Sequence, residues 1–193
     1  MARWGFPPPQ GYAPVTNIRH VQSPFWRGWL KADYRCLVPV TSFSEYAPGP
    51  GPRTGRKDIV WFSLDESRPL FAFAGLWRPW TGTRGTRAKP ADGDHELFGF
   101  LTTEPNAVVQ PIHPKAMPVI LREDDWETWL TADPAEALAL QKPWPDDRLK
   151  IVARGPAKQD ERPDYPPPEK DYGGGDIVSL EREPSTEDDQ PLE

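Results

Sequence analysis

Three side chains in this 193-residue sequence have types and positions that suggest chemistry: Glu45, His113 and Asn17. Glu45 ends an apolar run, "RCLVPVTSFSEY" (35–46), directly before a segment rich in Pro and Gly. His113 stands between two prolines in "QPIHPKAMPVIL", and the prolines restrict the backbone on both sides of the imidazole. A carboxylate and an imidazole are common partners in general acid–base catalysis, so these residues are candidate catalytic groups.

Each of these candidates also has an ordinary structural explanation. An exposed strand end explains Glu45, a hydrogen-bonded structural histidine explains His113, and a turn explains Asn17. A metal site built from His95, His113 and a carboxylate has no ligand spacing in its favour, so we expect no metal. The single cysteine, Cys36, lies in an apolar run and is expected to be a small buried side chain.

The elements that must position these residues are mostly strands, because β-branched and aromatic residues are grouped between turn residues. Two short helices are expected: one over "REDDWETWLTA", with Trp126, Trp129 and Leu130 on one face, and one that begins at Pro134. Residues 81–94 are polar and partly basic, and we expect a long loop there. The predicted fold class is α+β: a mixed, mainly antiparallel, curved or barrel-like sheet with a few short helices. The expected strands cover residues 35–46, 60–64, 70–77, 97–103, 117–121 and 149–154.

Charge is distributed unevenly along the chain, whose net charge is −6. The first 57 residues hold eight Lys or Arg and two Asp or Glu, whereas residues 159–193 hold three Lys or Arg and 12 Asp or Glu. A basic front half suits a polyanionic partner, although solvating surface charges explain it as well. We predict one domain over residues 1–156, followed by an acidic, Pro/Gly-rich disordered tail over residues 157–193.

The sequence contains no feature that resembles a signal peptide, and no apolar run approaches the roughly 20 residues that span a bilayer. A single cysteine leaves no internal disulfide. We therefore expect a cytoplasmic protein that does not contact the membrane.

Eight segments, taken in order, resemble the SRAP family, the SOS response-associated peptidases related to the shield of abasic sites in single-stranded DNA. No single segment is specific, but eight in the correct order over about 150 residues form a specific pattern. The segments are "RWGF" (3–6), "TNIR" (16–19), "RCLVPVTSFSEY" (35–46), "FAGLW" (73–77), "FLTTEPN" (100–106), "IHPKAMPVIL" (112–121), "WETWL" (126–130) and "LKIVARG" (149–155).

The resemblance implies a barrel-like α+β domain with a positively charged groove for single-stranded DNA. In the family, a cysteine at position 2, exposed when the initiator Met is removed, attacks the open-ring aldehyde of an abasic deoxyribose. Its amine forms a Schiff base, which its thiol closes to a thiazolidine, and this links DNA and protein covalently. We expect a DNA-repair protein that acts as a monomer without a cofactor and lies on the nucleoid when bound to DNA. In the full-length family form its peptidase activity would remove its own Met, and the sequence leaves open whether it cleaves other proteins.

The resemblance also assigns roles to the three candidates. Glu45 matches the family's glutamate and would transfer protons to and from the terminal amine and the leaving hydroxyl. His113 matches the family's histidine and would assist opening of the sugar ring by protonating its oxygen. Asn17 matches the asparagine of the "N-x-R" motif and would position the sugar.

Four further residues are expected to bind the DNA strand. Arg19, Arg3 and Lys115 would hold phosphates, which fixes the register of the strand without reading its sequence. The position of Lys115 is less well matched, because "IHPKAMP" has one residue more than the commonest family form. Trp4 would stack or wedge beside the site that lacks a base.

The sequence departs from the family at its start. The family begins with Met-Cys and a segment that precedes "RWG", whereas this sequence starts "MARWGF", with Ala2 at position 2. As written, it is expected not to form the thiazolidine and to lack the strands that this segment supplies. The alternatives are therefore an active protein that begins upstream, a non-catalytic module that binds single-stranded DNA, and an inactive truncated paralogue.

Overall fold

The computed structural model describes residues 2–7, 15–52, 55–86 and 88–160. The chain divides into two units, Met1–Asp160 and Glu161–Glu193, and the second lies outside the described residues. The predicted disordered tail over 157–193 falls almost entirely in that part, so its disorder stays a prediction. Within the described residues, no helix is long and apolar enough to cross a membrane.

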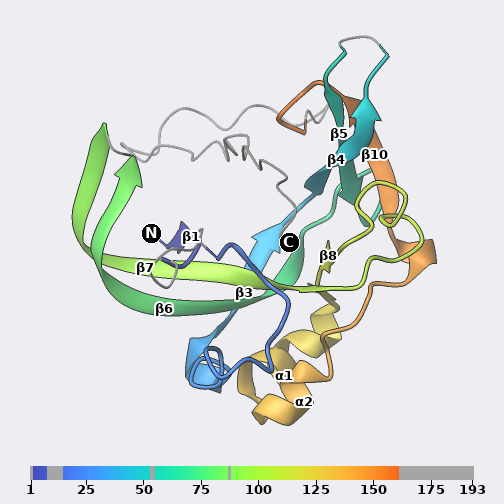
Figure 1. The fold of residues 1–193 in the computed structure, drawn as a ribbon. Helices are drawn as coiled ribbons and strands as arrows, with labels where there is room; N and C mark the ends of the chain where they lie inside the picture. The colour runs from blue at the N-terminus through green and yellow to red at the C-terminus, as the bar shows by residue number, and fades with distance from the viewer. Residues whose placement is uncertain (1, 8–14, 53–54, 87, 161–193) are drawn as a thin grey trace, which may run out of the picture. The chain divides into compact units, whose positions relative to one another are not determined.

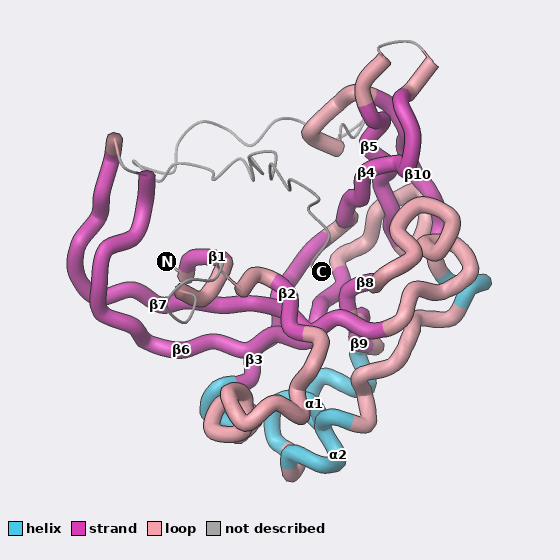
Figure 2. Tube along the Cα trace, viewed as in Figure 1, coloured by secondary structure: helices cyan, strands magenta, loops and turns pink. Residues whose placement is uncertain are grey.

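A long hairpin of two strands forms the middle of the larger sheet (Figures 1 and 2). Strands β6 and β7 pair antiparallel along most of their length, from Gly75 opposite Phe100 to Thr86 opposite Lys89. Strand β3 pairs antiparallel with β6, while β1 and β2 pair parallel with β7, so the sheet is mixed. The strands of this sheet are β1 (Arg3–Trp4), β2 (Asn17–Ile18), β3 (Arg35–Val40), β6 (Phe71–Thr86), β7 (Lys89–Thr103), β8 (Met117–Pro118) and β9 (Ile120–Leu121).

A smaller antiparallel sheet continues from the larger one, because β4 follows β3 after a two-residue break. Its strand order is β10-β5-β4. The expected single strand over 35–46 is therefore two strands that belong to different sheets. The strands are β4 (Phe43–Pro50), β5 (Lys57–Ser63) and β10 (Lys150–Gly155).

The helices of the described residues are short and lie together against the larger sheet (Figure 1). Trp129 of α1 is fully buried, and its indole N–H donates to the carbonyl of Cys36 on β3 (3.0 Å), which fixes the helix on the strand. The sequence correctly predicts both α-helices, including the proline at the start of the second. They are α1 (Trp126–Thr131) and α2 (Pro134–Leu138), with 3₁₀ turns η1 (Ala32–Tyr34), η2 (Glu123–Asp125) and η3 (Asp146–Arg148).

Residues 81–86 and 89–94 are strands and not parts of a loop, contrary to the expectation from sequence. They continue the β6–β7 hairpin, and hydrogen bonds between side chains on the two strands take the place of an apolar face. The hydroxyl of Thr81 donates to Asp94 (2.6 Å), and Trp80 stacks on His95 directly opposite (5.9 Å between ring centroids). Such cross-strand pairs stabilise a sheet even where both faces are polar.

Two apolar clusters form the core. One lies between the larger sheet and the helices and includes Leu76, Leu101 and Trp129; the other lies where the two sheets meet and includes Phe43, Phe62 and Phe73. The predicted α+β class, with a mainly antiparallel, curved sheet and few short helices, is confirmed. The second cluster matters for function, because Glu45 and His113 lie on elements that pack on it.

Candidate functional site

Glu45 lies near the middle of β4 and not at the end of a strand. It is opposite Val60 of β5, two residues after Phe43, which is opposite Phe62. Because side chains alternate along a strand, Glu45 and Phe43 point to the same face. The Glu45 side chain is 22% exposed, so the carboxylate is partly shielded and still reachable by a ligand.

His113 lies on the segment that leaves β7 at its end and returns as β8. Its backbone N–H donates to the carbonyl of Val109 (2.9 Å), and the preceding Ile112 is buried in the core. Asn106 organises this turn: its side-chain amide donates to the carbonyl of Trp144 (3.0 Å) and accepts from the N–H of Val109 (3.0 Å). The imidazole is thus held on a fixed backbone, with its side chain 33% exposed.

The fold brings Glu45 and His113 together, although 67 residues separate them in sequence. His113 Nδ1 lies 3.6 Å from Glu45 Oε2. This is longer than a good hydrogen bond and short enough for an ion pair when the imidazole is protonated. An acid and a base at this separation can act on two atoms of one small ligand and return the proton between them.

A line of aromatic rings connects this pair to the start of the chain. Phe43, on the same face of β4 as Glu45, packs against Phe73 (5.7 Å between centroids), and Phe73 packs against Phe100 (5.1 Å). The indole of Trp4 stacks nearly parallel on Phe100, at 5.6 Å with 9° between the ring planes. One face of the larger sheet therefore runs from Trp4 toward the carboxylate of Glu45.

Asn17 lies on that same face. It is opposite Phe100 in register, and the next residue, Ile18, points to the other face, where it is buried. Strand β7 supports the whole arrangement, because Trp4 is opposite its Phe98, Asn17 is opposite its Phe100, and the segment with His113 leaves from its end. Three of the predicted site residues thus depend on a single strand.

Arg19 is held at the end of β7 by two contacts. Its guanidinium pairs with Glu104 (2.9 Å), and its carbonyl accepts from the side chain of Gln141, which also donates to the carbonyl of Thr102. Backbone and Thr103 hydrogen bonds, and then the charge of Arg19, hold the pKa of Glu104 below its ordinary value. A phosphate at Arg19 would have to share the guanidinium with this carboxylate.

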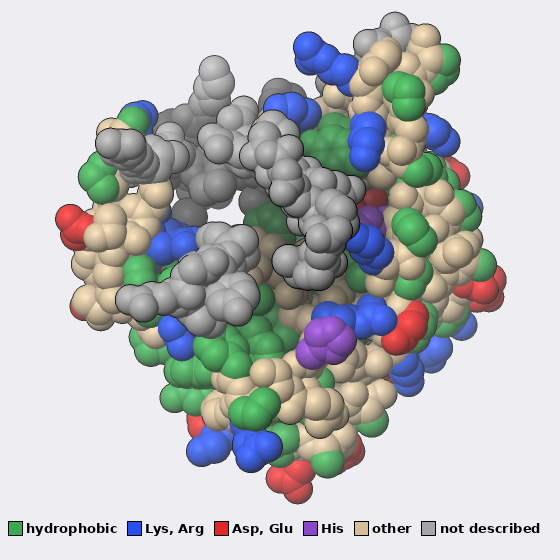
Figure 3. All heavy atoms as spheres, viewed as in Figure 1, with side chains coloured by type: hydrophobic (Ala, Val, Ile, Leu, Met, Phe, Trp, Pro, Cys, Tyr) green, Lys and Arg blue, Asp and Glu red, His purple; other side chains and the backbone are tan. Residues whose placement is uncertain are grey.

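The other two predicted cations lie in different places. Lys115 is exposed, two residues after His113, and so belongs to the same turn. Arg3 is opposite Leu97, and strand alternation turns it to the face away from Trp4 and Asn17. There it is close to Arg84, whose pKa is lowered mainly by burial and further by the charge of Arg3. Figure 3 shows several Lys and Arg side chains on the face viewed in Figure 1.

Cys36 is partly buried on β3, and burial raises the pKa of its thiol from 9.0 to about 12. Only the thiolate is a good nucleophile, so this side chain is poorly suited to attack an aldehyde. Within the described residues, no group of three His, Cys, Asp or Glu side chains is placed to hold a metal ion.

We expect Cys36 to react very slowly with a thiol-specific alkylating reagent in the folded protein. The pKa difference lowers the thiolate fraction at pH 8 by about 10³-fold relative to the unfolded chain. Mass spectrometry of timed reactions, with and without denaturant, measures this ratio. Equal rates in the two states would contradict a partly buried thiol that stays protonated.

Two important residues of the site were not predicted from sequence. Asn106 and Gln141 are buried or half-buried amides that hold the His113 turn and the Arg19 carbonyl. "EPNA" before a short helical turn is a signal for Asn106, since Asn often caps such turns. Gln141 lies 122 residues from Arg19 and has no local signal.

Three comparisons relate the chain to known proteins. The family model described as SOS response associated peptidase (SRAP) matches residues 1–154. The chain is 31% identical to the abasic site processing protein YoqW of Bacillus subtilis over 160 residues, and 33% identical to the abasic site processing protein YoaM of the same organism over 140 residues. These alignments cover 77% and 66% of this chain, and 65% and 54% of YoqW and YoaM. The chain thus spans less than two thirds of the length of either relative.

Solved structures of similar fold are also known. A protein from Bordetella bronchiseptica matches 80% of this chain and 74% of its own, with a TM-score of 0.58 and 23% identity. A protein from Bacteroides thetaiotaomicron matches 69% of this chain and 56% of its own, with a TM-score of 0.54 and 25% identity. The family model covers most of the chain, and the chain therefore belongs to the SOS response associated peptidase (SRAP) family.

Proposed function

We propose that this protein serves DNA repair by recognising abasic sites in single-stranded DNA. The observation that carries the proposal is the 3.6 Å approach of His113 to Glu45, on a partly exposed face that continues through stacked rings to Trp4. Family membership and the names of the relatives YoqW and YoaM support the substrate class. The half-buried Trp4 and Arg19 and the exposed Lys115 suit a flexible strand, because stacking and phosphate contacts need no base pairing.

In this proposal, the acid and the base act on the sugar that lacks a base. Glu45 takes the proton of the sugar's C1 hydroxyl while His113 donates a proton to the ring oxygen, so the ring opens to the aldehyde. The proton on Glu45 can then return to His113 across 3.6 Å, which restores both groups. Asn17 would orient the sugar through its amide, which offers both a donor and an acceptor.

The strand on either side would be held by charge and stacking. Arg19 and Lys115 would contact phosphates near the abasic nucleotide. Arg3 points to the opposite face of the sheet, so it could contact only phosphates of a strand that continues around the edge formed by β1. Trp4 has one ring face against Phe100, so the opposite face of its indole is the one that could stack on a neighbouring base. We propose that no cofactor takes part.

Covalent capture is a separate part of the proposal. Within the 193 residues the only cysteine is Cys36, with its pKa raised to about 12, and residue 2 is Ala2. For a polypeptide of these 193 residues alone we therefore propose non-covalent recognition. For a polypeptide with Cys directly after its initiator Met, we propose the thiazolidine crosslink, with Glu45 and His113 moving the protons.

Fluorescence anisotropy tests the proposed function. We expect single-stranded DNA with one abasic site to bind more tightly than an intact strand of the same length and composition. The affinity for both strands should fall with salt. A plot of log K against the logarithm of the salt concentration should have a slope of about −0.7 for each phosphate that is neutralised. A denaturing gel should show no heat-stable adduct with this sequence. Equal affinity for the two strands would contradict the proposal.

A further inference from the structure

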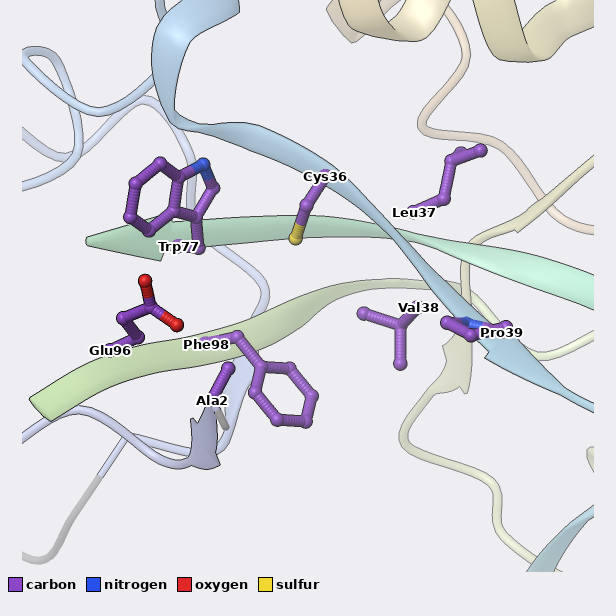
Figure 4. Close-up of a pocket in the computed structure, with 8 residues that line it drawn as sticks. All are labelled: Ala2, Cys36, Leu37, Val38, Pro39, Trp77, Glu96 and Phe98. Carbon is purple, nitrogen blue, oxygen red and sulfur yellow. The ribbon is translucent and has the colours of Figure 1, made fainter. Parts of the chain in front are cut away.

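The concave face of the larger sheet carries a hollow beside the proposed site. It has a volume of about 420 Å³, which lies in the usual range of ligand pockets. Its walls come from β3, β6, β7 and the residue before β1, and they are mainly apolar (Figure 4). The lining residues include Ala2, Cys36, Val38, Trp77, Glu96 and Phe98.

Glu96 is the charged residue in this lining. Its carboxylate is exposed and has no hydrogen bond or ion pair among the residues that the structure describes. Trp77 is opposite Phe98, so Glu96 is its diagonal neighbour on the adjacent strand, and Figure 4 shows the carboxylate next to the indole. An aromatic ring beside a free hydrogen-bond acceptor suits a flat ligand that has a donor on its edge.

The hollow lies on the same face of the sheet as the proposed abasic site. Glu96, Phe98 and Phe100 alternate on one face of β7, and Phe100 carries the stacked Trp4 and lies opposite Asn17. At a rise of ~3.4 Å per residue, Glu96 is about 14 Å along the strand from Phe100. A DNA strand held at Asn17 can therefore reach the hollow with a nucleotide a few positions away.

We propose that this hollow binds a nucleobase with an exocyclic amino group from the strand that flanks the abasic site. The inference rests on the proposed function. A phosphate would be repelled by Glu96, so a base and not the backbone fits here. The base would stack on Trp77, and its amino group would donate to Glu96, since an ionised carboxylate can only accept hydrogen bonds. Cytosine offers such a donor at N4, whereas thymine places the acceptor O4 at the same position.

Two oligonucleotides that differ only in this group test the inference. Each has one central abasic site, and the remaining nucleotides are all dC or all dT. We expect the wild-type protein to bind the dC strand on the order of 10-fold more tightly at pH 7.5, as for one hydrogen bond to a charged group. In Glu96→Gln the ratio should fall to about one, because the amide can donate to thymine as well as accept from cytosine.

Asp94→Asn is the matched control. Asp94 is on the same strand and face, bonds to Thr81, and is not part of the hollow's lining. The Asp94→Asn substitution removes the same charge as Glu96→Gln. It should therefore change the affinities for the dC and dT strands equally and leave their ratio as in the wild type. Tight binding with equal affinity for dC and dT, or the same ratio in Glu96→Gln as in the wild type, would overturn this inference alone. Failure of both strands to bind the wild-type protein would overturn the proposed function with it.

Discussion

Glu45→Gln and His113→Gln are each expected to lower the preference for abasic over intact single-stranded DNA by roughly 10- to 100-fold. The reason is the loss of a hydrogen bond to a charged group at the sugar, which contributes about 1.5–3 kcal/mol. The relevant quantity is the ratio of the two dissociation constants. Removal of a negative charge at residue 45 also strengthens binding of any DNA, and the ratio cancels that effect.

The two substitutions should not be additive. Because the side chains lie 3.6 Å apart and would act on the same sugar, the double variant should lose little more preference than either single variant. Glu66→Gln is the control for charge, since Glu66 is 75% exposed and its carboxylate makes a weak pair with Lys150. An unchanged preference in both single variants would remove the assigned roles of Glu45 and His113.

Arg68→Ala is expected to cause the largest loss of stability, about 3–5 kcal/mol in the free energy of unfolding. Arg68 is 8% exposed, and its guanidinium donates two hydrogen bonds to the carboxylate of Asp160, from Nε to Oδ2 (2.6 Å) and from Nη2 to Oδ1 (3.0 Å). It also donates to the carbonyls of Glu66 and Val152, and the hydrogen bonds to Asp160 raise the pKa of Arg68. Its removal leaves a buried carboxylate without its partner, which is the costly way to break an ion pair.

Chemical denaturation measures this loss, with two comparisons. Asp160→Asn should cost less than Arg68→Ala, because the amide keeps the shape and an acceptor for the guanidinium. Lys150→Gln breaks an exposed pair at 3.9 Å and should change stability by less than about 1 kcal/mol. Similar effects for Arg68→Ala and Lys150→Gln would show that the buried ion pair does not stabilise the fold.

Local patterns were sufficient to predict the apolar strands and the two α-helices. Clusters of aromatic and β-branched residues mark the inner halves of β6 and β7, and Pro134 marks the start of α2. The outer half of the hairpin was wrongly predicted as a loop over 81–94, because this segment is rich in Gly and Asp and contains Pro90, and these residue types are depleted in strands. Its pairing depends on partners across the hairpin, such as Thr83 with Asp92, which become visible only in the correct register.

The candidate site was predictable to a similar extent. The residue types of Glu45, His113 and Asn17, together with the resemblance, were sufficient to select them, and the first two prove to be neighbours. The face of each strand was not predictable, so Arg3 was grouped with Trp4 although alternation separates them. Long-range contacts, such as Gln141 with Arg19 or Arg68 with Asp160, leave no trace in local sequence.

Nuclear magnetic resonance, used to map which protein residues contact bound DNA, tests the central claim most directly. The claim is that one abasic nucleotide sits on the sheet face between Asn17 and the Glu45–His113 pair. Addition of an abasic single strand to the ¹⁵N-labelled protein should shift the backbone amides of Asn17, Phe100, Glu45 and His113 and leave those of α1 and α2 unchanged. Shifts confined to α1, α2 and the face of the sheet that they cover would contradict it.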